Sequence, residues 1–175
     1  MKKIILLLAL SLFLSNCKKE NNNHQSPNLI TNSGFENGSS FDLSHWTGNL
    51  ANSSTDTPNN SGYALQLRAG WLPDEGYAET VVGNLVGTYD LQLSLDYKVL
   101  TNNGAGRVIV YKSDRNGDRT ELISQELTSH SWQITHLNFR ANLSTFDSLI
   151  IHLSAGSTEL GDIRVLYDNV SLVTN

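Results

Sequence analysis

The chain has 175 residues, and its 12 lysine and arginine residues against 17 aspartate and glutamate residues give a formal net charge of −5 at pH 7. This acidic balance argues against a nucleic-acid-binding protein, which needs a clustered basic surface. The single cysteine excludes an internal disulfide, and the length suits one domain with its own hydrophobic core.

Residues 1–16 have the pattern of a secretory signal peptide. Lys2 and Lys3 precede an apolar run at residues 4–14, which is too short to span a bilayer. The sequence Leu-Ser-Asn-Cys that ends at Cys17 resembles the lipobox of bacterial lipoproteins. The resemblance implies cleavage before Cys17 and attachment of lipid to its sulfur. An ordinary signal peptide followed by an incidental cysteine is the alternative.

After cleavage the mature chain would have 159 residues and a net charge of −7. Residues 17–27 comprise the lipidated cysteine and a polar run with no apolar side chain to anchor it, so we expect a disordered tether. The lipid would be the sole membrane contact, and it would hold the protein at the outer membrane or the cell surface. The sequence leaves the periplasmic and the external side open.

Residues 28–175 show the period of two that is typical of β-strands. In the clearest segment, residues 89–99, leucines alternate with polar residues, which predicts a half-buried antiparallel strand. Similar segments occur at residues 63–68, 77–82, 107–112, 121–126, 132–140, 148–154 and 163–173. Turn-forming residues separate them; Asn116 and Gly117, for example, predict a hairpin turn rather than a calcium loop. Short strands at this spacing predict a single all-β domain, an antiparallel β-sandwich.

Two terminal motifs resemble those of a known family. An N-L-x-x-N-x-G-F-E pattern at residues 28–36 is followed by Trp46, and the chain ends with Y-D-N-V-S-L at residues 167–172. Residues 61–67 and the stretch from Trp132 to Phe139 are similar to strands of the same family. Together they resemble the galactose-binding-like jelly roll of carbohydrate-binding modules of the family 4/9 and 22 type. The family pattern places Trp132 in the core.

The resemblance implies a structural calcium ion where the first and last strands meet. Glu36, Asp168 and the carbonyl of Gly34 match the family's ligands, and a hard divalent cation prefers carboxylates mixed with backbone carbonyls. The alternative is that both carboxylates only accept hydrogen bonds from nearby backbone amides.

Two regions are candidates for sugar binding. Trp71 and Tyr77 bound a loop rich in glycine and proline, where exposed aromatic faces could stack on sugar rings. The second candidate is the polar face of the alternating strands, which is the concave face in cleft-binding members of the family. Its candidate ligand-binding residues are Gln92, Asp96, His136, His152 and Arg164, and Gln66, Arg68, Ser94, Lys98 and Asn138 share the face by the same parity. An ordinary solvated sheet face is the alternative.

The sequence has no nucleophile elbow, P-loop or dinucleotide fingerprint, and its histidines lack zinc-ligand spacing. We therefore expect a protein that is not an enzyme, a monomer that binds a polysaccharide or oligosaccharide and no nucleic acid. A structural or adhesion domain without sugar binding is the main alternative, and a small enzyme of glycan degradation is the third.

Overall fold

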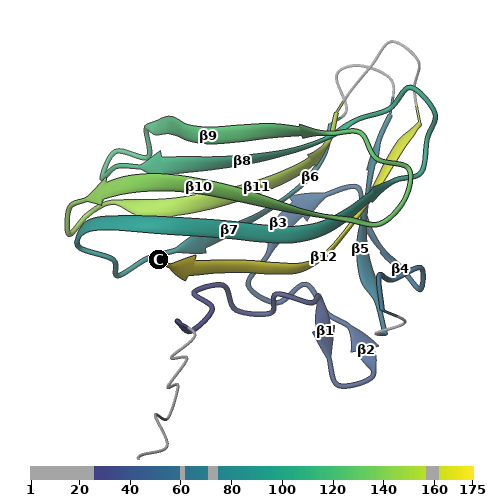
Figure 1. Cartoon of the computed structure of the whole chain (residues 1–175), viewed down its shortest axis with the longest axis horizontal. Helices are drawn as coiled ribbons and strands as arrows, with labels where there is room; N and C mark the ends of the chain where they lie inside the picture. Colours follow the sequence, from purple (N-terminus) through teal and green to yellow (C-terminus); the bar gives the residue numbers. More distant parts are fainter. Residues whose placement is uncertain (1–25, 60–61, 71–74, 157–161) are drawn as a thin grey trace, which may run out of the picture.

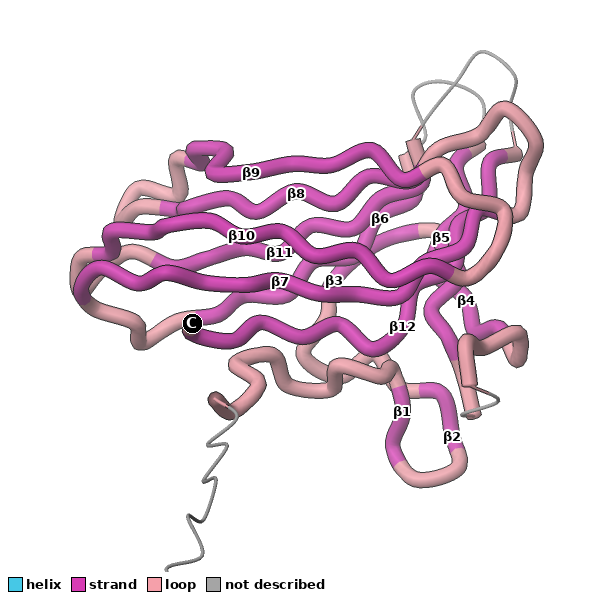
Figure 2. Tube along the Cα trace, in the orientation of Figure 1, coloured by secondary structure: helices cyan, strands magenta, loops and turns pink. Residues whose placement is uncertain are grey.

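The computed structural model describes residues 26–59, 62–70, 75–156 and 162–175. The signal peptide, Cys17 and Trp71 lie outside these residues. The described residues form strands, turns and loops without a helix, as the all-β prediction requires (Figure 2). Accordingly, this part of the chain contains no helix long and apolar enough to cross a membrane.

Two five-stranded antiparallel sheets pack face to face in a β-sandwich (Figure 1). The β12 sheet, named for its central strand, has the order β10 (Gln133–Leu143), β7 (Gly87–Val99), β12 (Ile163–Thr174), β5 (Ala64–Ala69), β4 (Ala51–Ser54). The β11 sheet has the order β3 (Thr47–Asn49), β6 (Gly76–Val82), β11 (Ser148–Ala155), β8 (Gly106–Ser113), β9 (Arg119–Leu127). A separate short hairpin comprises β1 (Glu36–Asn37) and β2 (Ser40–Phe41).

The core lies between the inner faces of the two sheets and follows the predicted alternation. Leu91, Leu93 and Leu95 of β7 are buried, and so are Val108 and Val110 of β8 in the opposite sheet. Burying one such side chain stabilises the fold by about 1.5–3 kcal/mol. All eight predicted strands are present within a few residues of their expected limits, so the predicted antiparallel sandwich is confirmed.

Tyr167 connects the two sheets through the core. Its ring is fully buried, and its hydroxyl group donates a hydrogen bond of 2.6 Å to the carbonyl of Ser154 on β11. Burial raises the pKa of this phenol, which therefore stays protonated. A Cβ atom at Gly106 would lie 2.5 Å from the Tyr167 hydroxyl oxygen, so this position of β8 accepts only glycine without a shift.

The tryptophans divide between core and surface. Trp46 is buried against Phe35, with ring centroids 5.0 Å apart. Trp132, which we expected in the core, is only half-buried, and its indole N–H donates a 2.9 Å hydrogen bond to Asp56. That prediction is wrong because Trp132 precedes β10 and covers the outside of the β12 sheet beside Lys98, which pairs with the same Asp56.

The connections gather at the two ends of the sandwich (Figure 1). The turns β6–β7, β8–β9 and β10–β11 lie at one end, and the β7–β8 and β9–β10 connections lie at the other. The β8–β9 connection is the predicted hairpin turn: the Asp114 carboxylate accepts the N–H groups of Asn116 and Asp118, and Gly117 adopts a φ of 84°.

Candidate functional site

The segment before β1 runs beside the end of β12, and this pairing creates the first candidate site. The N–H of Leu29 donates to the carbonyl of Leu172 (2.8 Å), and the N–H of Val170 donates to the carbonyl of Ser33 (2.9 Å). As a result a Cβ atom at Gly34 would lie 3.9 Å from Oδ1 of Asp168. The two ends of the domain therefore meet at the residues for which we expected a calcium site.

Asp168 has the environment of a cation ligand. Its side chain is buried, Oδ1 accepts the N–H of Asn169 at 2.7 Å, and the buried Oδ2 has no hydrogen-bond partner. Burial raises the pKa of this carboxyl group to about 7, and the negative charges of Glu36 and Asp96 add to that rise. A buried carboxylate oxygen without a partner needs an explanation, and a bound cation supplies one.

Glu36 is fixed beside this position. Its carboxylate accepts the backbone N–H of Tyr63, and a Cβ atom at Gly62 would overlap the same carboxylate. Gly62 also has a φ of 59°, so both backbone angle and space restrict this position to glycine. In the described ranges, no three or more acidic, histidine or cysteine side chains are placed so that together they could hold a metal ion. A cation here would therefore need backbone carbonyls, such as that of Gly34, beside the carboxylates.

The polar face of the β12 sheet brings together four of the predicted ligand-binding residues. Gln92 and Asp96 on β7, His136 on β10 and Arg164 on β12 have outward-facing register positions. Gln92, however, donates a 3.0 Å hydrogen bond to Asn138, and the buried Asp96 accepts a 2.7 Å bond from Asn169. Asp96 therefore holds the side chain of Asn169, next to Asp168 on β12, rather than facing solvent.

His152 does not belong to that face. It lies on β11, opposite Glu79 of β6 and Ile109 of β8, and therefore on the outer face of the other sheet. The prediction failed because strand parity tells which side of its own sheet a residue occupies and does not tell which sheet contains the strand. Tyr77 belongs to β6, as the predicted strand at residues 77–82 requires, and it lies beside His152.

Three rings form an aromatic cluster on the outer face of the β11 sheet. Tyr77 and His152 are stacked, with centroids 5.6 Å apart and an interplanar angle of 13°. Tyr111 of β8 meets the same histidine edge-on, at 6.1 Å and 78°. The cluster therefore spans three adjacent strands, β6, β11 and β8.

A charged pair lies across the cluster. The guanidinium of Arg119 binds both carboxylate oxygens of Glu79, at 2.6 and 3.1 Å, and Nδ1 of His152 lies 2.8 Å from the same carboxylate. Although burial alone would raise the pKa of Glu79, the bonds from Arg119 and His152 hold that pKa below its ordinary value. Arg119 starts the edge strand β9, so its side chain must reach over β8, where it lies 5.8 Å from the Tyr111 ring centre.

Neighbouring side chains cover two apolar residues at the centre of this face. Ile109 and Ile150 have outward register positions, yet only 5% and 6% of their surfaces are exposed. Flat rings beside planar charged groups suit a ligand that has both apolar and hydroxyl-bearing faces. Glu79 and Arg119 are not among the site residues that the sequence predicts. Alternation within β6 points to Tyr77 and Glu79 together, whereas no local pattern indicates that Arg119 reaches across the sheet.

No family model and no curated protein sequence matches the chain. Solved structures do share its fold. TmCBM61, solved in complex with β-1,4-galactotriose, matches 86% of this chain over 100% of its own length, with 17% identity and a TM-score of 0.57. The CBM22-1 xylan-binding domain of Xyn10C from Paenibacillus barcinonensis matches 86% over 96% of its length, with 15% identity and a TM-score of 0.56.

The enzymatically active domain of tailspike protein 4 from bacteriophage CBA120 matches 85% of this chain, with 15% identity and a TM-score of 0.65. The chain spans only 21% of the length of that tailspike chain. At such identities the comparisons establish the fold alone. The chain has the jelly-roll β-sandwich fold of carbohydrate-binding modules, as the terminal motifs implied.

Proposed function

We propose that the protein binds a glycan without catalysis, on the outer face of the β11 sheet. The observation that carries this proposal is the aromatic cluster of Tyr77, Tyr111 and His152 beneath the Glu79–Arg119 pair. The apolar C–H face of a sugar ring can stack on an aromatic ring, and the planar carboxylate and guanidinium can exchange hydrogen bonds with its hydroxyl groups. The solved modules named above bind galactotriose and xylan, and this supports the same ligand class here.

The site differs from the loop platform expected from the sequence, because Tyr77 is directed to the sheet face with His152. The polar face of the β12 sheet is the weaker candidate. Its Gln92 and Asp96 are occupied by hydrogen bonds within the protein, whereas the β11 face offers three aromatic rings in contact.

A glycan array followed by calorimetry with galacto- and xylo-oligosaccharides tests the site. Tyr77→Ala and Tyr111→Ala should each weaken binding about tenfold or more, because truncating an aromatic contact in a binding site removes over 1 kcal/mol. Gln92→Ala, on the opposite face, is the matched control and should leave affinity unchanged. Loss of binding with Gln92→Ala alone would move the site to the β12 sheet. If no glycan binds, the structural or adhesion role replaces the proposal.

The proposal includes a structural calcium ion and a lipid anchor. Glu36, Asp168 and the Gly34 carbonyl would hold the ion, which would neutralise two carboxylates in the buried junction between the chain ends. The partnerless Oδ2 of Asp168 supports this assignment. Lipid on Cys17 would attach the domain, through residues 18–27, to the outer membrane or the cell surface.

A further inference from the structure

The outer face of the β12 sheet carries two arginines that share one carboxylate. Arg68 of β5 and Arg164 of β12 are directly opposite each other in the antiparallel register. Both side chains point outward, since their neighbours Leu67 and Val165 are buried, and the side chains are 53% and 45% exposed. Like charges placed directly opposite in a sheet are destabilising, so this arrangement requires an anion.

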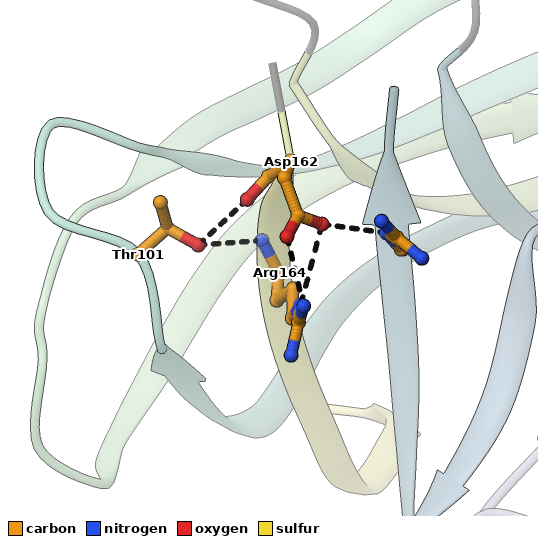
Figure 3. A network of polar contacts seen from close by, with 4 residues as sticks. Thr101, Asp162 and Arg164 are labelled. Carbon is orange, nitrogen blue, oxygen red and sulfur yellow. Dashed lines mark hydrogen bonds and ion pairs between the residues drawn. The ribbon is translucent and has the colours of Figure 1, made fainter. Parts of the chain in front are cut away.

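Asp162 supplies one negative charge between the two arginines (Figure 3). Its Oδ1 lies 2.5 Å from Nε of Arg68, and its Oδ2 lies 2.8 Å from an Nη atom of Arg164. These bonds, first from Arg164 and then from Arg68, hold the pKa of Asp162 below its ordinary value. The carboxylate is therefore ionised at neutral pH, and the three residues together keep a net charge of +1.

Thr101 fixes this arrangement from the β7–β8 connection. Its hydroxyl group donates to the carbonyl of Asp162 at 3.0 Å and accepts the backbone N–H of Arg164 at 3.0 Å (Figure 3). The backbone of Asp162 is held at a φ of 43°. The main chain that carries the Asp162 carboxylate and the Arg164 side chain is thus held by Thr101.

The sharing of one carboxylate by two guanidinium groups distinguishes this cluster from the other ion pairs of the described residues. Elsewhere among the described residues, five cations pair one-to-one with carboxylates, and a sixth, Arg115, lies over the ring of Phe146 instead. The five pairs are Lys98 with Asp56, Arg107 with Glu121, Lys112 with Asp147, Arg119 with Glu79 and Arg140 with Asp90. Asp162 is the only carboxylate in these ranges that two arginines share. A local excess of cation on a chain of net charge −5 points to an external anion.

The guanidiniums retain donors for such an anion. Each carries five N–H groups, and the bonds to Asp162 engage Nε of Arg68 together with Nε and Nη2 of Arg164. Within the described part of the chain, Nη1 and Nη2 of Arg68 have no acceptor. Planar guanidinium groups bind the oxygens of carboxylates and of tetrahedral anions through paired N–H donors.

We infer that Arg68 and Arg164 form a second ligand site, which binds an anionic substituent of a glycan, either a carboxylate or a sulfate ester. The site lies on the face opposite the aromatic cluster, so one molecule would contact a glycan at two separate surfaces. The inference rests on the proposed function only in taking the anion to be part of a glycan. It does not require that the aromatic cluster bind the same molecule.

Calorimetry at low ionic strength with three oligosaccharides of matched length tests the inference. The probes are a chondroitin sulfate oligosaccharide, its desulfated form, which keeps the uronate, and a neutral xylo-oligosaccharide. The double variant Arg68→Gln, Arg164→Gln should lose at least tenfold in affinity for the anionic probe and none for the neutral probe. Asp162→Asn should strengthen anion binding severalfold, because it removes the competing internal carboxylate. Arg140→Gln, on the same face and more exposed, is the matched control.

The three probes distinguish a carboxylate from a sulfate ester as the bound group. Binding of the desulfated form identifies a carboxylate as the ligand, and binding of the sulfated form alone identifies a sulfate ester. Equal losses in the double variant and in Arg140→Gln would show a non-specific charge effect and overturn the inference, as would no binding of either anionic probe. Failure of the proposed aromatic site would instead appear as absent binding of the neutral probe, with the response of the anionic probe to Arg68 and Arg164 unchanged.

Discussion

Gly106 and Tyr167 form a complementary pair between the two sheets, and their fit can be tested directly. Gly106→Ala places a methyl group against the Tyr167 hydroxyl oxygen, and such overpacking typically destabilises a fold by about 1–3 kcal/mol. Tyr167→Phe removes the hydroxyl group and leaves the Ser154 carbonyl without its donor, at a cost of about 1 kcal/mol. Combining both substitutions should cost less than their sum. Denaturant unfolding measures all three, and strict additivity would contradict a direct clash.

Asp168 makes stability depend on pH. Its pKa in the folded protein is raised to about 7 by burial, so in the absence of metal the native state holds a proton that the unfolded state releases. The contribution of Asp168 to stability without calcium should therefore be fully present below about pH 4 and be lost as the pH rises through 7. Asp168→Asn should flatten this dependence. Melting temperatures in chelator across this range would show it.

Calcium should reverse that trend, because it favours the ionised carboxylate. The stabilisation by calcium should grow with pH and reach about 2.7 kcal/mol at 100 times the dissociation constant, a shift of several degrees. Melting curves at pH 5 and pH 8, each with calcium and with chelator, provide the comparison. A protein stripped of bound ions whose curves are the same with and without calcium at both pH values would reject the cation site.

The long strands could be predicted from the sequence, because they are rich in apolar and β-branched residues, alternate clearly in β7, and are separated by turn-forming residues. The short strands could not. All three residues of β3 are exposed, and β4 contributes four small residues with two partly buried, so neither carries a periodic signal. The terminal motifs identified the meeting of Glu36 and Asp168, since they rest on a known family pattern. The sequence could not predict which of the two sheets contains each strand, because this depends on long-range strand pairing. The alternation within one strand does not encode that pairing.

The segment that follows β4 acts as a cover on the outside of the β12 sheet. Asp56 of this segment accepts a hydrogen bond from Trp132 and forms an ion pair with Lys98. Leu166 of β12 has an outward register position opposite Gln66, and it is nevertheless fully buried. Outward positions of this sheet are therefore not uniformly exposed to solvent.

Because Trp132 lies in this surface cover and Trp46 lies in the core, alanine substitutions of the two residues should reduce stability by different amounts. Trp46→Ala removes a buried ring from the core and should cost about 3–5 kcal/mol. Trp132→Ala should cost clearly less, because the half-buried ring leaves no closed cavity and loses mainly one hydrogen bond. Chemical denaturation of both variants checks the order, and a larger loss for Trp132→Ala would show that the cover stabilises the fold more than the core ring does.

For the protein as a whole, attachment to the membrane depends on Cys17 in our proposal. Cys17→Ala should leave the precursor unprocessed or release the mature domain, because the lipid supplies the membrane affinity. Cell fractionation with detection of the processed form measures this. A processed variant that still sediments with membranes would contradict the lipid anchor.

The pairing between the segment before β1 and the end of β12 has a mechanical consequence. Ser26 accepts a hydrogen bond from Thr174, and Leu29 is bonded to Leu172, so the chain leaves the domain beside its own C-terminus. If the tether is fixed to a membrane and the domain grips a glycan, tension acts first on this short pairing. Peeling it from β12 would draw Gly34 and Glu36 away from Asp168. A cation that joins those residues would resist the pull, so the force needed to open the domain would rise with the calcium concentration around the cell.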